Sequence, residues 1–97
     1  MSADEIVTQA AQLITSGDYA GAMAVFEGYI DSNPDDPAGY HGWAEAALFD
    51  IQENGNLDDK GNDRINEGQI NAYFRRAASM APENADYNAA YANALVE

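Results

Sequence analysis

The fold of this 97-residue chain is decided by residues 17–47, GDYAGAMAVFEGYIDSNPDDPAGYHGWAEAA. Two runs of apolar residues at helical spacing stand on either side of Pro34, which cannot continue a helix. The apolar positions of the two runs are, in order, Tyr19, Ala22, Val25, Phe26, Tyr29 and Ile30, then Tyr40, Trp43, Ala44, Ala47 and Leu48. Asp18 is a suitable N-cap for the first run, and Pro37 suits the first turn of the second. The stretch therefore predicts helices over residues 18–32 and 37–49.

The same spacing recurs on both sides of this stretch. It predicts further helices over residues 3–15, 65–81 and 84–96, and no segment alternates with the two-residue period of a strand. The chain is therefore expected to be all-α, with about five helices. The aromatic residues of the apolar stripes are expected to pack in the core between neighbouring helices: Phe26, Trp43, Phe74 and Tyr91.

An internal repeat relates the two halves of the chain. Phe26 precedes Pro34 by eight residues, as Phe74 precedes Pro82, and the two prolines are 48 residues apart. This pattern resembles a tetratricopeptide repeat, whose period is about 34 residues, and the excess of about 14 residues indicates an insertion within residues 50–66. The resemblance implies an antiparallel helix-hairpin solenoid in a single domain, residues 1–97. Its first hairpin would be residues 3–33, its second residues 37–81 interrupted by the insertion, and its capping helix residues 84–96.

The resemblance also implies a protein–protein interaction scaffold. In this family the first helix of each repeat lines a concave face that binds a peptide or protein. On that mapping the partner-binding positions are Val7, Ala11, His41, Glu45, Ala89 and Asn93. Residues 1–59 contain no Lys or Arg, so the partner is expected to be basic or apolar. A structural part of a larger repeat assembly, or a homo-oligomer, is the alternative for so short an array.

The charge balance excludes several classes of partner. Seventeen Asp and Glu against four Lys and Arg give a net charge of −13, which disfavours nucleic acid and anionic membrane surfaces. A solubilising surface, adaptation to a high-salt host, or a surface for cations or basic partners would each account for this acidity. There is no run of the roughly 20 apolar residues that a membrane span needs. The N-terminus lacks the basic start and apolar stretch of a signal peptide, so a cytoplasmic location is expected.

The insertion offers oxygen ligands at close spacing. From Asp50 onward it resembles the first nine positions of an EF-hand calcium loop, with Gly55 at the sixth place, but Gly61 occupies the twelfth, where a bidentate carboxylate belongs. The candidate ligands are Asp50, Gln52, Asn54, Asn56, Asp58 and Glu67. The alternative interpretation is an ordinary acidic loop, because Asp, Asn and Gly are turn formers. A divalent-cation module that binds Ca²⁺ in preference to Mg²⁺ is therefore a second functional hypothesis.

Catalytic patterns are sparse in this sequence. His41 is the only histidine, there is no cysteine, and the eight glycines form no phosphate-binding loop. His41 and Glu45 are four residues apart, which fits a surface pair on one helix. We therefore expect a protein that is not an enzyme.

Overall fold

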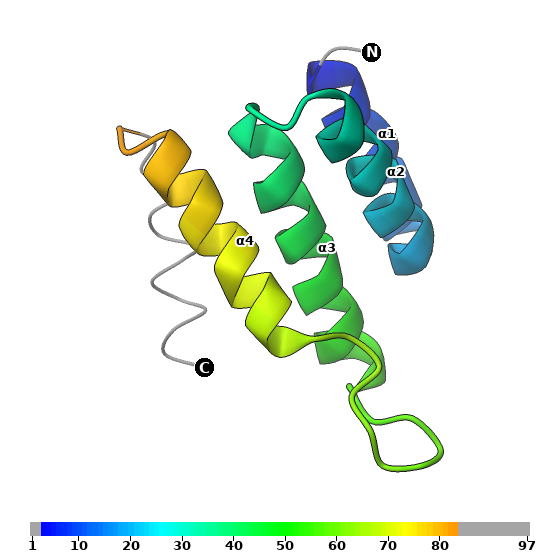
Figure 1. Ribbon diagram of the computed structural model, residues 1–97. Helices are drawn as coiled ribbons and strands as arrows, with labels where there is room; N and C mark the ends of the chain where they lie inside the picture. The colour runs from blue at the N-terminus through cyan, green and yellow to red at the C-terminus, as the bar shows by residue number, and fades with distance from the viewer. Residues whose placement is uncertain (1–2, 84–97) are drawn as a thin grey trace.

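The chain forms an array of helices, described by a computed structural model for residues 3–83 (Figure 1). The helices are α1 (Ala3–Thr15), α2 (Tyr19–Ser32), α3 (Pro37–Asn54) and α4 (Glu67–Met80). Residues 3–83 contain no strand, and their one β-type contact is an isolated bridge between Leu57 and Asp63. The all-α prediction is confirmed for these residues. The described residues hold four helices instead of five, and the predicted fifth, residues 84–96, lies outside them.

Local capping explains where the helices begin. The Asp18 carboxylate accepts the Gly21 N–H at 2.9 Å and caps α2, as its sequence position predicts. Asp36 caps α3 by accepting the Ala38 N–H at 2.9 Å, and Pro37 occupies the first turn. Gly55, with φ of 78°, ends α3 in a backbone conformation that favours glycine.

Successive helices lie side by side and reverse direction at each connection, as Figure 1 shows. The main contacts join α1 to α2, α2 to α3, and α3 to α4, while α1 touches α3 at few positions. Phe26, Trp43 and Phe74 are buried between these helices, which confirms their predicted place in the core; Tyr91 lies outside the described residues. Between α3 and α4 the Tyr73 ring packs edge-on against Tyr40 and Trp43, with centroids 5.2 and 5.1 Å away.

Two glycines allow α2 and α3 to approach closely. A Cβ at Gly42 would stand 2.1 Å from Cε1 of Phe26, and one at Gly39 would stand 2.8 Å from Cγ1 of Ile30. The side chains of α2 therefore occupy the space that larger residues on α3 would need. Glycine inside a helix costs about 1 kcal/mol relative to alanine, and here close packing compensates for that cost.

The bounds of the insertion differ from those predicted. The helix expected to end near residue 49 continues to Asn54, and α4 begins at Glu67 instead of residue 65. Four of residues 50–54 are polar and a glycine follows them, so their composition resembled that of a loop. Asp50 and Ile51 nevertheless gain tertiary contacts that keep the segment helical. The α3–α4 loop is residues 55–66. No helix within residues 3–83 has the length and apolar character needed to cross a membrane.

Candidate functional site

The predicted partner-binding residues of α1 and α3 form two outward stripes. Val7 is 49% exposed, and Ala11, one turn later, is also exposed. On α3, Nε2 of the half-buried His41 lies 3.4 Å from Oε2 of the exposed Glu45, as expected for residues one turn apart. We call these four residues, together with Phe49, the α1–α3 face. The other two predicted positions, Ala89 and Asn93, lie outside the described residues.

Phe49 was not predicted for this surface. It follows Glu45 by one turn on α3 and is 39% exposed. The His41 ring, at the other end of the stripe, packs edge-on against the buried Phe74 with centroids 5.8 Å apart. The α3 stripe is therefore anchored in the core at His41 and exposes an aromatic ring at Phe49. Phe49 follows Glu45 by four residues, and this spacing was the sequence signal that could have identified it.

Asp50, the first predicted calcium ligand, is engaged by protein groups. It is only 7% exposed, and its Oδ1 accepts hydrogen bonds of 2.9 Å from Arg64 Nη2 and from Asn54 Nδ2. Burial by itself would raise the pKa of this carboxyl, but the two hydrogen bonds and the Arg64 charge outweigh it and hold the pKa below its ordinary value. Arg64 also donates to the Gly55 carbonyl and so ties the loop back to the end of α3.

The α3–α4 loop is organised by its own side chains. Asn56 acts as a clamp, because its Oδ1 accepts the Ile65 N–H at 2.8 Å while its Nδ2 donates to the Ile65 carbonyl at 2.9 Å. Asp58 Oδ1 accepts the backbone N–H groups of Lys60 and Asn62 at 2.8 and 2.9 Å, which fixes the tip of the loop. Such an insertion needs an organising force, and these hydrogen bonds provide one from the protein itself.

The six predicted calcium ligands do not converge in this structure. Asp50, Gln52 and Asn54 lie on α3, where residues two apart point about 200° away from each other; Gln52 is exposed while Asp50 is buried. Of the other three, one pair is in contact: Glu67 Oε2 accepts from Asn56 Nδ2 at 3.4 Å. Within residues 3–83, no three His, Asp or Glu side chains group in a way that could hold a metal ion. Calcium binding thus stays a prediction from sequence alone.

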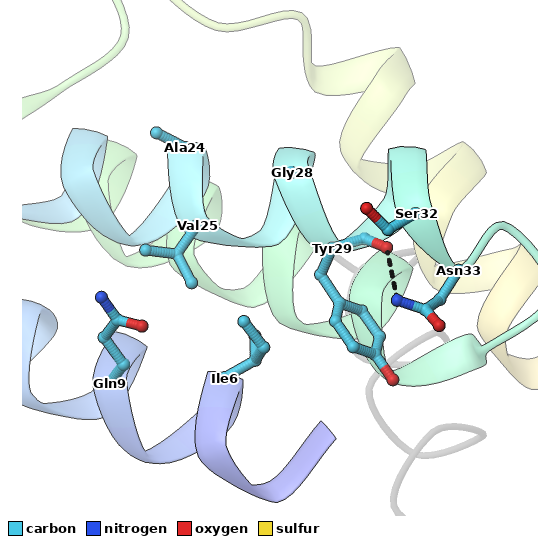
Figure 2. Close-up of a pocket in the computed structure, with 8 residues that line it drawn as sticks. All are labelled: Ile6, Gln9, Ala24, Val25, Gly28, Tyr29, Ser32 and Asn33. Carbon is cyan, nitrogen blue, oxygen red and sulfur yellow. Dashed lines mark hydrogen bonds between the residues drawn. The ribbon is translucent and has the colours of Figure 1, made fainter. Parts of the chain in front are cut away.

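A second concave surface lies between α1 and α2, on the side of this pair away from α3 (Figure 2). We call it the α1–α2 groove; its volume is about 340 Å³. It is lined from α1 by Ile6 and Gln9 and from α2 and its C-cap by Ala24, Val25, Gly28, Tyr29, Ser32 and Asn33. None of these residues was predicted as a site. Gly28, an exposed glycine in the interior of a predicted helix, was the one signal in the sequence.

The four cations of the chain stand away from α1 and α2. Arg64 pairs with Asp50, and the Arg76 guanidinium lies over the Tyr40 ring, 4.8 Å from its centroid. Lys60 is at the loop tip, and Arg75 is exposed on α4. The surfaces of α1 and α2 therefore carry carboxylates as their only charged side chains. Comparisons of this chain with protein-family models, with curated proteins and with solved structures found no match.

Proposed function

We propose that this chain is a protein-binding scaffold of the tetratricopeptide-repeat type that holds a peptide or protein segment on the α1–α3 face. One observation carries the proposal. Within residues 3–83 the exposed large hydrophobic side chains are Val7, Phe49 and Leu57, and two of the three belong to the α1–α3 face. Large apolar side chains that are exposed on one face can be buried against another protein.

The repeat-type architecture is supported by the order of contacts. Consecutive helices pack in pairs, α2 bridges α1 and α3, and glycines allow the second helix of one pair to approach the first helix of the next. In such an array the first helices of successive hairpins stand on one side, and on that basis we assign α1 and α3 to a common face.

The chemistry of the face defines the partner. Glu45 is exposed between His41 and Phe49, and no Lys or Arg occurs on α1, α2 or α3. A partner segment would complement this face if an apolar residue of the segment contacted Phe49 or Val7 and a Lys or Arg contacted Glu45. Charge complementarity selects the partner, while apolar contact supplies affinity. The proposed role is binding, with no catalytic step.

Selection from a random peptide display library tests this proposal. Selected peptides are expected to combine Lys or Arg with apolar residues, and their affinity should fall about tenfold in Val7→Asp and in Phe49→Ser, because each removes apolar contact of about 1.4 kcal/mol or more. Leu57→Ser is the matched control, since Leu57 is 69% exposed but lies in the loop. Equal binding by all three variants, or selection of peptides without basic residues, would contradict the proposal.

A further inference from the structure

The shape of the α1–α2 groove is suited to the packing of another helix. It runs between two packed antiparallel helices, and its α2 wall is built from positions one turn apart: Ala24, Gly28 and Ser32. Side chains this small leave a shallow channel along the helix. The opposite wall is formed by the buried Ile6 and by Gln9 of α1. A third helix can place a ridge of apolar side chains in such a channel, as helices do when they pack on one another.

Gly28 supplies an independent observation. A Cβ added there meets no atom within 4 Å in the described part of the chain, whereas a Cβ at Gly39 or Gly42 would collide with α2 side chains. The fold therefore gives no steric reason for glycine at position 28, although glycine weakens a helix interior relative to alanine. What Gly28 does is keep the α2 wall of the groove open (Figure 2).

The rim of the groove is acidic. Glu27 lies three residues after Ala24, and Asp31 lies three residues after Gly28, so both carboxylates adjoin the α2 wall. Both are exposed. No Lys or Arg occurs in residues 1–59 to offset them. An apolar channel with an acidic rim is complementary to a helix that has apolar residues on one face and cations along its edges.

The same charges argue against two other occupants. Residues 84–97 of this chain have apolar residues at helical spacing but contain Asp86, Glu97 and no cation. A second copy would bring a further net charge of −13. Like charges facing one another across a contact are unfavourable, so a basic partner is the occupant that the groove fits.

We propose that the α1–α2 groove binds one amphipathic helix of a basic partner protein, with its apolar residues against Ile6 and Val25 and its Lys or Arg beside Glu27 and Asp31. This site is separate from the α1–α3 face and does not depend on the function proposed for that face.

The probe is a synthetic amphipathic peptide of Leu and Lys, about 15 residues long so that a helix can form. A peptide with the same Leu positions and Glu in place of Lys is its control. We expect the Lys peptide to shift the amide resonances of α1 and α2 around the groove, and the Glu peptide to shift none. The affinity should fall several-fold between about 50 and 500 mM NaCl, because exposed ion pairs are screened by salt.

Gly28→Leu is the decisive variant. The new side chain projects from an open position, so the fold tolerates it, and it fills the groove; we expect at least a tenfold loss of affinity with an unchanged or higher melting temperature. Ala20→Leu, on an exposed position of the same helix outside the groove lining, is the control and should bind as the wild type does. The pair Glu27→Gln with Asp31→Asn should lose about three- to tenfold at low salt.

Four results would overturn the proposal. The first two concern the peptides: no binding at about 1 mM peptide, or equal binding of the Lys and Glu peptides. The other two concern Gly28→Leu: this variant binds as well as the wild type, or the wild type is a dimer that Gly28→Leu dissociates. The last would assign the groove to a second copy. Val7→Asp distinguishes the two sites. The Lys peptide should still bind the groove in this variant, and loss of its binding would show that the peptide occupies the α1–α3 face instead.

Discussion

Replacing glycine with alanine at Gly42, and separately at Gly28, applies one chemical change to neighbouring helices with opposite expected results. At Gly42 the new Cβ would lie 2.1 Å from Cε1 and 2.3 Å from Cζ of Phe26, where carbon atoms in contact normally stand about 3.5–4.0 Å apart. Phe26 is buried in the core. The added methyl group must therefore separate α2 from α3 or force the ring out of its position.

The sizes of the two effects follow from separate contributions. Overpacking costs about 1–3 kcal/mol, and a contact as short as 2.1 Å corresponds to the upper half of that range, about 2–3 kcal/mol. The helix preference of alanine returns about 1 kcal/mol, so Gly42→Ala should lower the free energy of unfolding by about 1–2 kcal/mol. In Gly28→Ala there is no overpacking, so only the helix preference of alanine changes the free energy of unfolding, and it raises it. At about 4–8 °C per kcal/mol, we expect a melting temperature lower by about 4–16 °C for Gly42→Ala and higher by about 4–8 °C for Gly28→Ala.

Urea and thermal unfolding, followed by circular dichroism and by fluorescence of the adjacent Trp43, measure both variants. Phe26→Leu in the Gly42→Ala background provides the coupling test, because a smaller side chain removes the collision. The double variant should then be more stable than the sum of the single changes predicts, by about 1 kcal/mol. A Gly42→Ala protein as stable as the wild type would refute the close approach of α2 and α3 at this point.

Three further predictions concern the loop and its anchor. Because the pKa of Asp50 is lowered in the folded state, Asp50→Asn should cost about 1–2 kcal/mol of unfolding free energy at pH 7. In urea unfolding, this difference from the wild type should shrink as the pH falls below about 3.9 and disappear once Asp50 is protonated in the folded state as well. Asp59→Asn, at an exposed loop position, is the control and should leave the free energy of unfolding at pH 7 unchanged. Asn56→Ala removes the clamp and should speed hydrogen exchange of the loop amides and cost about 1–2 kcal/mol, whereas Asn62→Ala should leave exchange unchanged apart from its own amide. Since protein hydrogen bonds organise the loop, equal concentrations of Ca²⁺ and Mg²⁺ should give the same melting temperature; a rise of several degrees specific to Ca²⁺ would instead establish the calcium site.

Short-range signals in the sequence were sufficient for α1, α2 and the core. Asp18 and Pro37 have the capping chemistry that begins a helix, and the apolar spacing places Phe26 and Trp43 on inward faces. These features depend on residues within a few turns of one another. Local sequence therefore carries the information that specifies them.

Long-range contacts account for what the sequence did not reveal. The segment that begins at Asp50 has the composition of a loop. Arg64, 14 positions later, pairs with Asp50 and lets α3 continue to Asn54. The α1–α2 groove also depends on how two helices meet, and only Gly28 signalled it. Neither the ion pair nor the groove has a fixed spacing in the sequence, because each is set by tertiary packing.

Binding of a partner segment to the α1–α3 face is tested by an amide NMR titration. The ¹⁵N-labelled chain is titrated with a peptide selected from the display library. We expect the α3–α4 loop to be unaffected and the shifts to be concentrated on the α1–α3 face, at Val7, Ala11, His41, Glu45 and Phe49. Shifts confined to residues 55–66, or an unchanged spectrum with a peptide that binds by another assay, would contradict it.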